Sequence, residues 1–284
     1  MKLRLLSFDI EDWFHILDNP KTQFPEQWQS FESRIDLGLD LILEMCRKHK
    51  IRGLFFCLGW VAEKYPELIV KIKSEGHLIG THSYAHQLAY TQTRNQFKDD
   101  LERSIKILKS ITGDEILYYR APGFSVTRDN LWVFDVLVEC GIKYDSSLFN
   151  SNRAHGGLKN QLFFEPFKLL TPSGDIIFEL PIVPKKFRLG SLMFSGGGYF
   201  RILPIKILKK LFNSEPYIMT YFHPRDFDPE QPMVPGLGYF RKFKSYYGLK
   251  SANRKLQTIL SITEFTTEID DIVFKRTINL DSIV

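Results

Sequence analysis

Short apolar runs alternate with amphipathic stretches along most of the 284-residue chain. The runs are rich in Ile, Val, Leu, Phe and Tyr, a composition typical of β-strands. Between them, apolar residues recur every three or four positions over residues 35–46, 97–108 and 131–138, which predicts helices. The predicted strands are Lys2–Asp9, Gly53–Leu58, His77–Thr81, Leu117–Arg120, Ile142–Asp145, Ile176–Leu180 and Tyr217–Phe222.

The alternation of strand and helix indicates an α/β fold with parallel strand–helix–strand units, either an open sheet or a barrel. An α/β barrel of about 250 residues is a common single domain. We see no repeat, low-complexity tract or linker that would separate a second domain, so we expect one domain over residues 1–284. Residues 149–173 have the least periodic pattern and are interpreted as a loop insertion.

Conspicuous polar side chains come at the ends of the predicted strands and not at their starts. In parallel barrels the carboxyl ends of the strands form one face, and active sites are built there. The pattern therefore predicts a catalytic site at that face. The residues concerned are Asp9, His82, Arg120, Asp145 and His223, at the ends of the first, third, fourth, fifth and last strands.

Two histidines, His82 and His86, lie four positions apart. On a helical turn this spacing puts both imidazoles on one side, where they can share a metal ion. A histidine pair alone is weak evidence for a metal site. The acidic cluster Asp9-Ile10-Glu11-Asp12 strengthens the case for a metal site, because the cluster can supply a third ligand and leave a further carboxylate free. Such a cluster also caps helix N-termini, which is the structural alternative.

The segment from Lys185 to Lys255 is basic, with 14 Lys and Arg against 4 Asp and Glu, whereas the remainder has 24 against 29. Such a region suits an anionic polymer, a lipid diphosphate or a membrane surface, and it also suits a solvated face. Within it, Gly196–Gly198 lacks the Gly-Lys-Ser/Thr of a P-loop. We interpret this run as a turn or as backbone that approaches a saccharide, flanked by Tyr199 and Arg201.

Composition excludes several classes of protein. With 44% hydrophobic and 25% charged residues, the chain is neither disordered nor fibrous. Its 3 scattered cysteines do not make a disulfide scaffold, and they favour a reducing compartment. We find no targeting segment and no apolar run of about 18 residues, which predicts a cytoplasmic protein, with peripheral contact at the inner membrane face as an alternative. No nucleic-acid recognition motif is seen.

Four motifs, taken together and in order, resemble those of the polysaccharide deacetylases of carbohydrate esterase family 4, the NodB homology domain. The resemblance covers about residues 1–225, and residues 195–201 and 223–229 resemble a subgroup associated with bacterial surface or exported polysaccharide synthesis. It implies a distorted seven-stranded (β/α) barrel, followed here by an extension over about 226–284. The motifs are Ser7-Phe8-Asp9 with Asp12, His82-Ser83-Tyr84-Ala85-His86, Arg120-Ala121-Pro122-Gly123 and the late His223.

The resemblance also implies roles for the matching residues. Asp9 would be the general base, oriented by Arg120, and His223 the general acid. A divalent metal, Zn²⁺ in our prediction, would be held by two histidines and a carboxylate. The catalytic residues are then Asp9, Arg120 and His223, the metal ligands Asp12, His82 and His86, and the substrate-binding residues Pro122, Tyr199 and Arg201.

The chain departs from the family pattern in two places. Family members usually have adjacent aspartates in the first motif, whereas here Glu11 stands between Asp9 and Asp12. On an extended strand Glu11 would share a face with Asp9, while a turn after Glu11 favours Asp12, which we expect to be the ligand. Many members also carry an aspartate followed by a tryptophan that adjusts the acidity of the catalytic histidine. Here Leu148 and Phe149 stand at that place. The candidates to take over the role of that aspartate are Asp145, Asp226 and Asp228.

These patterns predict a metal-dependent hydrolase that removes an N-acetyl group from a sugar of a polysaccharide or its precursor. The metal would activate water, the base would take its proton, and the acid would protonate the amine leaving group. The substrate could be polymeric, lipid-linked or nucleotide-linked. Two alternatives remain: an allantoinase-like amidohydrolase acting on a small cyclic amide or ureide, and a saccharide-binding protein without catalysis.

Overall fold

A computed structural model describes residues 2–151, 155–158, 163–188, 190–266, 268–269 and 272–280. The chain divides into two compact units, each assembled from segments that are distant in sequence. Parts of the predicted insertion (152–154 and 159–162) and of the predicted extension (267, 270–271 and 281–284) lie outside the described residues. Unit 1 consists of Met1–Leu54, Ser74–His77 and Pro184–Thr267, and unit 2 of Phe55–Lys73, Leu78–Val183 and Glu268–Val284.

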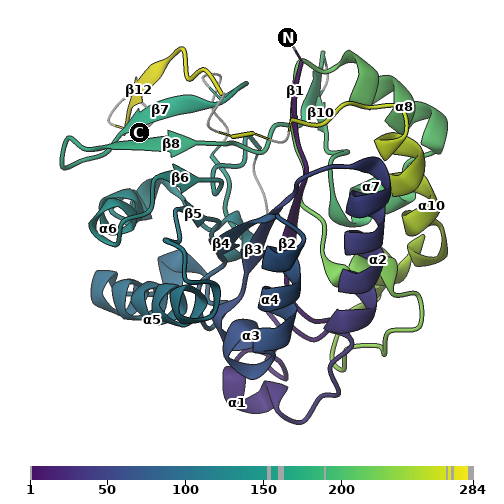
Figure 1. Cartoon of the computed structure of the whole chain (residues 1–284), viewed down its shortest axis with the longest axis horizontal. Helices are drawn as coiled ribbons and strands as arrows, with labels where there is room; N and C mark the ends of the chain where they lie inside the picture. The colour runs from purple at the N-terminus through teal and green to yellow at the C-terminus, as the bar shows by residue number, and fades with distance from the viewer. Residues whose placement is uncertain are drawn as a thin grey trace. The chain divides into compact units, whose positions relative to one another are not determined.

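Unit 1 contains the first and last of the predicted strands, side by side. β1 (Leu3–Leu5) pairs in parallel with β11 (Tyr217–Met219), and the pairing continues where Phe8 of β2 (Ser7–Ile10) meets Phe222. The helices α7, α8 and α10 of this unit pack together (Figure 1). Its other elements are α1 (Pro25–Trp28), α2 (Ile35–His49), β9 (Lys185–Phe187), β10 (Gly190–Leu192), α7 (Gly197–Ile202), α8 (Ile205–Ser214), η4 (Pro224–Phe227), α9 (Tyr239–Tyr246) and α10 (Leu249–Leu260).

Helix α2 lies against the η4 turn that follows His223. Gly38 faces this turn, and a Cβ at Gly38 would lie 2.1 Å from the carbonyl oxygen of Pro224. Only a residue without a side chain permits so close an approach of helix and backbone. The glycine therefore lets α2 support the turn that carries His223.

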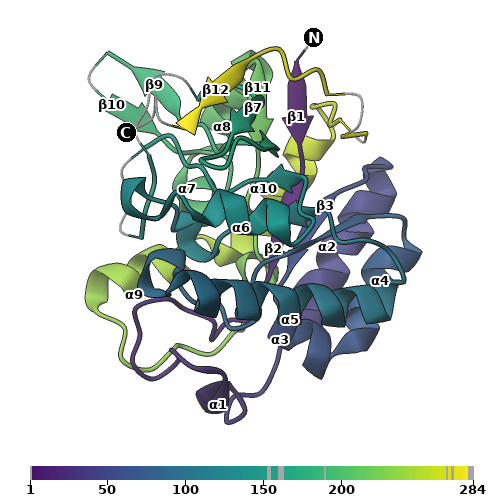
Figure 2. The same ribbon diagram turned by 90° about the vertical axis from the view of Figure 1, so that its left-hand side faces the viewer.

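Unit 2 is a mostly parallel sheet with helices packed on it. The strand order is β3-β4-β5-β6-β8-β7-β12, and the β7–β8 pair is antiparallel. Helix α5 lies along α6 (Figure 2), and both contribute apolar side chains to one buried cluster. The elements are β3 (Leu54–Cys57), α3 (Gly59–Lys64), α4 (Pro66–Ser74), β4 (Leu78–Thr81), η1 (Ala89–Thr91), α5 (Arg94–Thr112), β5 (Tyr118–Tyr119), η2 (Pro122–Phe124), η3 (Arg128–Asn130), α6 (Val133–Glu139), β6 (Tyr144–Asp145), β7 (Phe167–Leu170), β8 (Ile176–Glu179) and β12 (Thr277–Asn279).

Each of the seven predicted strands is present, the first of them as β1 and β2 together. The interpretation of residues 149–173 as a loop needs one correction, because β7 forms near the end of that stretch. Phe167 and Leu169 point into the core while Lys168 does not. Four residues with a single polar position are too short a run for the period-2 pattern to be recognised. Among the described residues, no helix is long and apolar enough to cross a membrane.

Candidate functional site

The ends of β2 and β11 bring three reactive side chains of unit 1 together. Asp9 lies in β2, Glu11 follows it, and His223 follows β11. His223 Nε2 lies 3.4 Å from Glu11 Oε1 and 3.7 Å from Asp9 Oδ2. One ligand atom from each of the three lies within 4.8 Å of the others, a spacing that can hold a metal ion. The base and acid candidates are therefore neighbours, because parallel pairing brings the two strand ends to one edge.

Asp226 holds His223 in place. Its Oδ2 accepts a hydrogen bond from the backbone N–H of His223 at 3.0 Å and lies 3.2 Å from the Nδ1 of the same residue. Its Oδ1 lies 3.1 Å from Nε of Arg201, which is buried and also donates to the carbonyl oxygens of Lys244 and Ser245. Of the three aspartates considered for tuning the histidine, Asp226 is the one in contact with it.

The charges around His223 favour its protonated form. Burial alone would lower the pKa of His223, but Asp226, Glu11 and Asp9 together raise it to about 9. Burial raises the pKa of Asp226, but Arg201 and His223 outweigh it and hold that pKa below its usual value. The site thus contains an imidazolium that can donate a proton at neutral pH.

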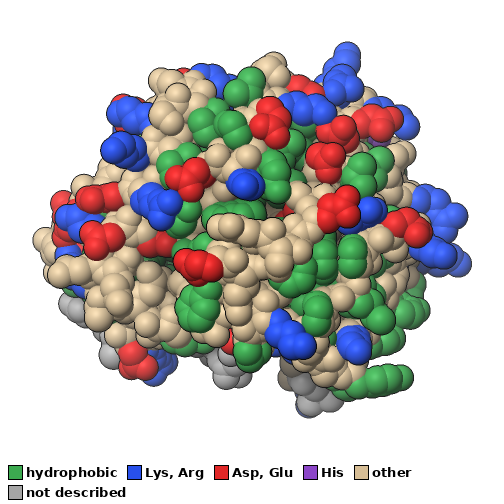
Figure 3. Space-filling model, turned by 90° about the horizontal axis from the view of Figure 1, so that it is seen from below, with side chains coloured by type: hydrophobic (Ala, Val, Ile, Leu, Met, Phe, Trp, Pro, Cys, Tyr) green, Lys and Arg blue, Asp and Glu red, His purple; other side chains and the backbone are tan. Residues whose placement is uncertain are grey.

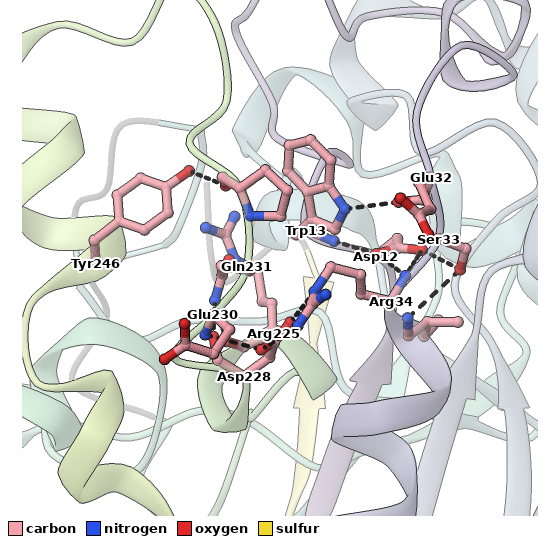
Figure 4. Close-up of polar contacts among 12 residues, drawn as sticks. Asp12, Trp13, Glu32, Ser33, Arg34, Arg225, Asp228, Glu230, Gln231 and Tyr246 are labelled. Atoms are coloured by element: carbon pink, nitrogen blue, oxygen red, sulfur yellow. Dashed lines mark hydrogen bonds and ion pairs between the residues drawn. The ribbon is translucent and has the colours of Figure 1, made fainter.

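Asp12 anchors the first motif to the start of α2. Its Oδ1 accepts from the backbone N–H of Trp13 at 2.8 Å, its Oδ2 accepts from the hydroxyl of Ser33, and both accept from the N–H of Arg34 (Figure 4). Burial raises the pKa of Asp12 to about 6, although these hydrogen bonds act in the opposite direction. To ligate a metal, Asp12 would have to give up bonds that hold the N-terminus of a helix.

The other two candidate aspartates have structural partners. Asp228 accepts two hydrogen bonds from Arg34, at 2.6 and 3.0 Å, and so ties the segment after η4 to the start of α2 (Figure 4). In unit 2, Asp145 accepts from both the backbone N–H and the hydroxyl of Ser147. Each of these carboxylates stabilises a connection between elements.

In unit 2, His82 and His86 lie on a loop after β4. The prediction of a helical turn is wrong, because residues 82–86 form no helix and both Ser83 (φ 66°) and His86 (φ 52°) are in the left-handed region. The two rings are nevertheless close, with centroids 5.3 Å apart. Their ligand nitrogens lie within 4.8 Å of each other, so the pair can still share an ion.

Asp100 of α5 explains how this loop keeps its shape. Its carboxylate accepts from the backbone N–H groups of Tyr84 at 2.7 Å and Ala85 at 2.9 Å. These donors would bond within the backbone if the segment were a helix. Burial raises the pKa of Asp100, against the effect of these bonds. In the sequence Asp100 is one of several acidic residues of α5, and no local signal distinguishes it from the others.

Arg120 fixes the orientation of His82 through its backbone. The carbonyl oxygen of Arg120 lies 2.7 Å from Nδ1 of His82, so a proton on Nδ1 is bound there and Nε2 is left as the ligand atom. The guanidinium is buried, donates to the hydroxyl of Ser146 at 3.0 Å, and lies 4.1 Å from the ring centre of Phe56. Arg120 belongs to unit 2 and Asp9 to unit 1, so the expected role of Arg120 in orienting Asp9 stays a prediction.

The three residues expected at the substrate are placed differently from one another. Pro122 is buried at the start of η2, and Tyr199 of α7 is 36% exposed with Nζ of Lys244 4.8 Å from its ring centre. The side chain of Arg201 is buried and paired with Asp226, so the structure shows its role in supporting Asp226, and its contact with substrate stays a prediction. Sequence spacing does not show which side of α7 is covered.

The glycine run before α7 is a packing feature. A Cβ at Gly196 would lie 2.1 Å from the carbonyl oxygen of Tyr221, and one at Gly198 would lie 2.7 Å from that of Lys244. Gly197 has φ 53° and begins α7. These glycines therefore let three backbone segments approach closely.

Comparison with known proteins places part of the chain in a family. Residues 28–144 match the family described as polysaccharide deacetylase. We call this matched range the deacetylase domain, after the family that it resembles. It contains His82, His86 and Arg120, whereas Asp9 precedes it. Residues 146–273, which include His223, match a domain of unknown function (DUF3473).

The deacetylase domain has relatives of known name. The Bacillus subtilis peptidoglycan-N-acetylmuramic acid deacetylase PdaA is 37% identical over 82 residues, which are 28% of this chain and 31% of the relative. The chain spans only about a third of the length of the first curated relatives it matches. Among these relatives is a peptidoglycan deacetylase from Helicobacter pylori, 27% identical over 117 residues, or 41% of this chain and 39% of the relative.

Solved structures confirm the fold prediction. A Mycobacterium smegmatis protein assigned to the polysaccharide deacetylases has a TM-score of 0.58 at 20% identity, covering 95% of this chain and 94% of its own. An allantoinase has a TM-score of 0.60 at 14% identity, covering 94% of this chain and 88% of its own. The fold is the (β/α) barrel of the deacetylases, and at these identities the likeness shows the fold alone.

Proposed function

We propose that this protein is a metal-dependent hydrolase that removes the N-acetyl group from an N-acetylated saccharide. The observation that carries the proposal is the contact of His223 with Asp9, Glu11 and Asp226. It joins a carboxylate suited to act as a base with an imidazolium suited to act as an acid. The deacetylase domain and the peptidoglycan deacetylases among its relatives support the substrate class.

In this proposal a divalent metal, Zn²⁺, is held by His82, His86 and one carboxylate of the first motif. Two imidazoles and a carboxylate suit zinc, and the contact of His82 with the Arg120 carbonyl selects Nε2 for the ion. We now prefer Glu11 to Asp12 as the third ligand, because both oxygens of Asp12 are bonded at the start of α2. When bound, such a metal polarises the amide carbonyl and lowers the pKa of water.

The protein's own side chains would move the protons. Asp9, oriented by Arg120, would accept a proton from the attacking water, and Nε2 of His223 would donate one to the amide nitrogen as it leaves. Before substrate binds, the neighbouring carboxylates of Asp226, Glu11 and Asp9 raise the pKa of His223 to about 9, although burial acts in the opposite direction, which favours the protonated form that an acid requires.

Mass spectrometry of N-acetylhexosamine substrates in polymeric, lipid-linked and nucleotide-linked form tests the activity, with loss of one acetyl group as the expected result. Asp9→Asn and His223→Ala should each lower kcat about 10²- to 10⁴-fold. A rate like that of the unaltered protein in either variant would reject the assigned role.

The same panel decides between the alternatives. Allantoin belongs in it, because an allantoinase shares the fold, and ureide hydrolysis without acetate release would overturn the proposal. Metal analysis of the His82→Ala/His86→Ala variant should show loss of bound zinc. A metal-loaded protein that binds saccharides but releases no acetyl group would support the non-catalytic alternative.

A further inference from the structure

Helix α9 exposes aromatic side chains to solvent. Tyr239 is 89% exposed and Phe240 is 86% exposed, and no residue of the helix is buried. The exposed residues recur at helical spacing, so they share one side. We call Tyr239, Phe240, Phe243 and Tyr247 the aromatic patch. A contiguous exposed apolar patch of this kind marks an interaction surface.

The charged residues in the segment that carries the aromatic patch have one sign. Residues 232–250 contain 4 Lys and Arg and no Asp or Glu. Lys244 and Lys250 are exposed, whereas the face drawn in Figure 3 has acidic and basic side chains interspersed. Much of the basic segment is used internally: Arg201 pairs with Asp226, and Lys255 bonds to backbone carbonyls. Part of the exposed basic charge, Lys244 and Lys250, therefore belongs to the segment that carries the aromatic patch, and further exposed lysines lie on α8.

This combination favours a lipid surface over other occupants. A helix with aromatic residues on one side and lysines beside them lies in the interface of an anionic bilayer. A second copy of the chain would bring like charges together across a symmetric interface. Binding of neutral sugars uses carboxylate and amide groups to bond hydroxyls, and residues 232–250 have none.

The patch is also tied to the proposed acid. Arg201 donates to the carbonyl oxygens of Lys244 and Ser245 at the end of α9, and it pairs with Asp226, which contacts His223. A lipid surface bound at α9 would therefore lie two side chains away from His223. We propose that α9 docks the protein on an anionic membrane surface through the aromatic patch and its neighbouring lysines.

Co-sedimentation of the full chain with vesicles tests this proposal independently of any enzymatic activity. The protein should bind vesicles of phosphatidylcholine mixed with phosphatidylglycerol, and should bind pure phosphatidylcholine more weakly. Phe240→Ser/Phe243→Ser should lower partitioning at least about tenfold, since two large apolar side chains no longer insert. Lys244→Glu/Lys250→Glu should lower it about fivefold or more for each lysine, with a smaller effect at high salt.

Phe24→Ser is the matched control, because Phe24 is 48% exposed at the N-cap of α1 in the same unit and is not part of residues 232–250. It should bind vesicles as the unaltered protein does, and all variants should keep the same Tm. No vesicle binding, or equal binding by Phe240→Ser/Phe243→Ser, would overturn the proposal. The proposal would also be overturned if Phe240→Ser/Phe243→Ser impaired only sedimentation with insoluble peptidoglycan, or only dimer formation.

Discussion

The partners of individual charged side chains decide what His223 can do. Three aspartates lie at suitable places in the sequence, but only Asp226 contacts the histidine, because the η4 turn folds it back. Arg201 pairs with Asp226 and donates to a carbonyl oxygen of α9, so His223, Asp226 and Arg201 form a buried row of alternating charge. The row holds the ring through Nδ1 and leaves Nε2 facing Glu11 and Asp9.

Replacing Asp226 should destabilise the protein in a pH-dependent way. Asp226→Asn leaves Arg201 buried without its counter-charge, so we expect a loss of about 3–5 kcal/mol in the free energy of unfolding at pH 7. The pKa of Asp226 is lowered by folding, so its stabilisation is complete above the unfolded pKa of about 3.9 and is lost as the pH falls further.

Urea unfolding at pH 7 and at more acidic pH measures this effect. The difference between the unaltered protein and Asp226→Asn should shrink as the pH falls, whereas Glu230→Gln, a change of an exposed carboxylate in the same unit, should have little effect at either pH. A difference that stays constant with pH would show that the charge of Asp226 is not the source of the stabilisation.

Helix α5 acts as the support for the histidine loop. Strand β4 ends at Thr81, and the loop that follows depends on Asp100 of α5 for two of its backbone bonds and on Ser104 for the carbonyl of Ser83. A loop with two left-handed residues other than glycine persists only when its surroundings hold it. The geometry of the two histidines is therefore a property of a neighbouring helix.

Removing the Asp100 carboxylate should weaken metal binding without unfolding the protein. Asp100→Ala is expected to lower zinc affinity about 10- to 100-fold, as for other changes to groups that orient ligands. Competition with a chromophoric chelator measures the affinity, and Asp99→Ala, an exposed neighbour on the same helix, is the control. Equal affinity in the two variants would mean that the loop keeps its shape without Asp100.

At the scale of the whole molecule, the proposed catalytic groups are divided between the two compact units. Asp9, Glu11 and His223 belong to unit 1, and His82, His86 and Arg120 belong to unit 2. The deacetylase match over 28–144 includes residues of both units, and the match over 146–273 does too. Under the proposed function, both matched regions and the residues before them contribute to one reaction.

Metal removal should therefore change the stability of the full chain. A ligand at about 100 times its Kd stabilises the folded state by about 2.7 kcal/mol, so added zinc should raise the Tm and a chelator should lower it again. Differential scanning calorimetry measures the shift. The His82→Ala/His86→Ala variant should show no zinc-dependent shift, and a full response from it would place the ion elsewhere, for example at Asp9, Glu11 and His223.

The sequence alone determined the strands, the fold class and the two groups of candidate residues. Hydrophobic alternation is a local signal, so each of the seven strands could be read from the residues that form it. The placement of polar residues at strand ends likewise depends only on order along the chain. Two local predictions were wrong. Strand β7 has only four residues, too few to recognise, and the histidine loop contains left-handed residues, which the spacing of the histidines does not indicate.

Only the tertiary structure decided which polar group meets which. Arg201 and Asp226 are 25 positions apart in the sequence and meet because α7 and η4 both pack against α10. Asp12 accepts a hydrogen bond from a backbone N–H at the start of α2, and Asp100 accepts one from a backbone N–H of the histidine loop. Such choices depend on burial and on satisfying buried donors and acceptors, which are properties of the packed chain.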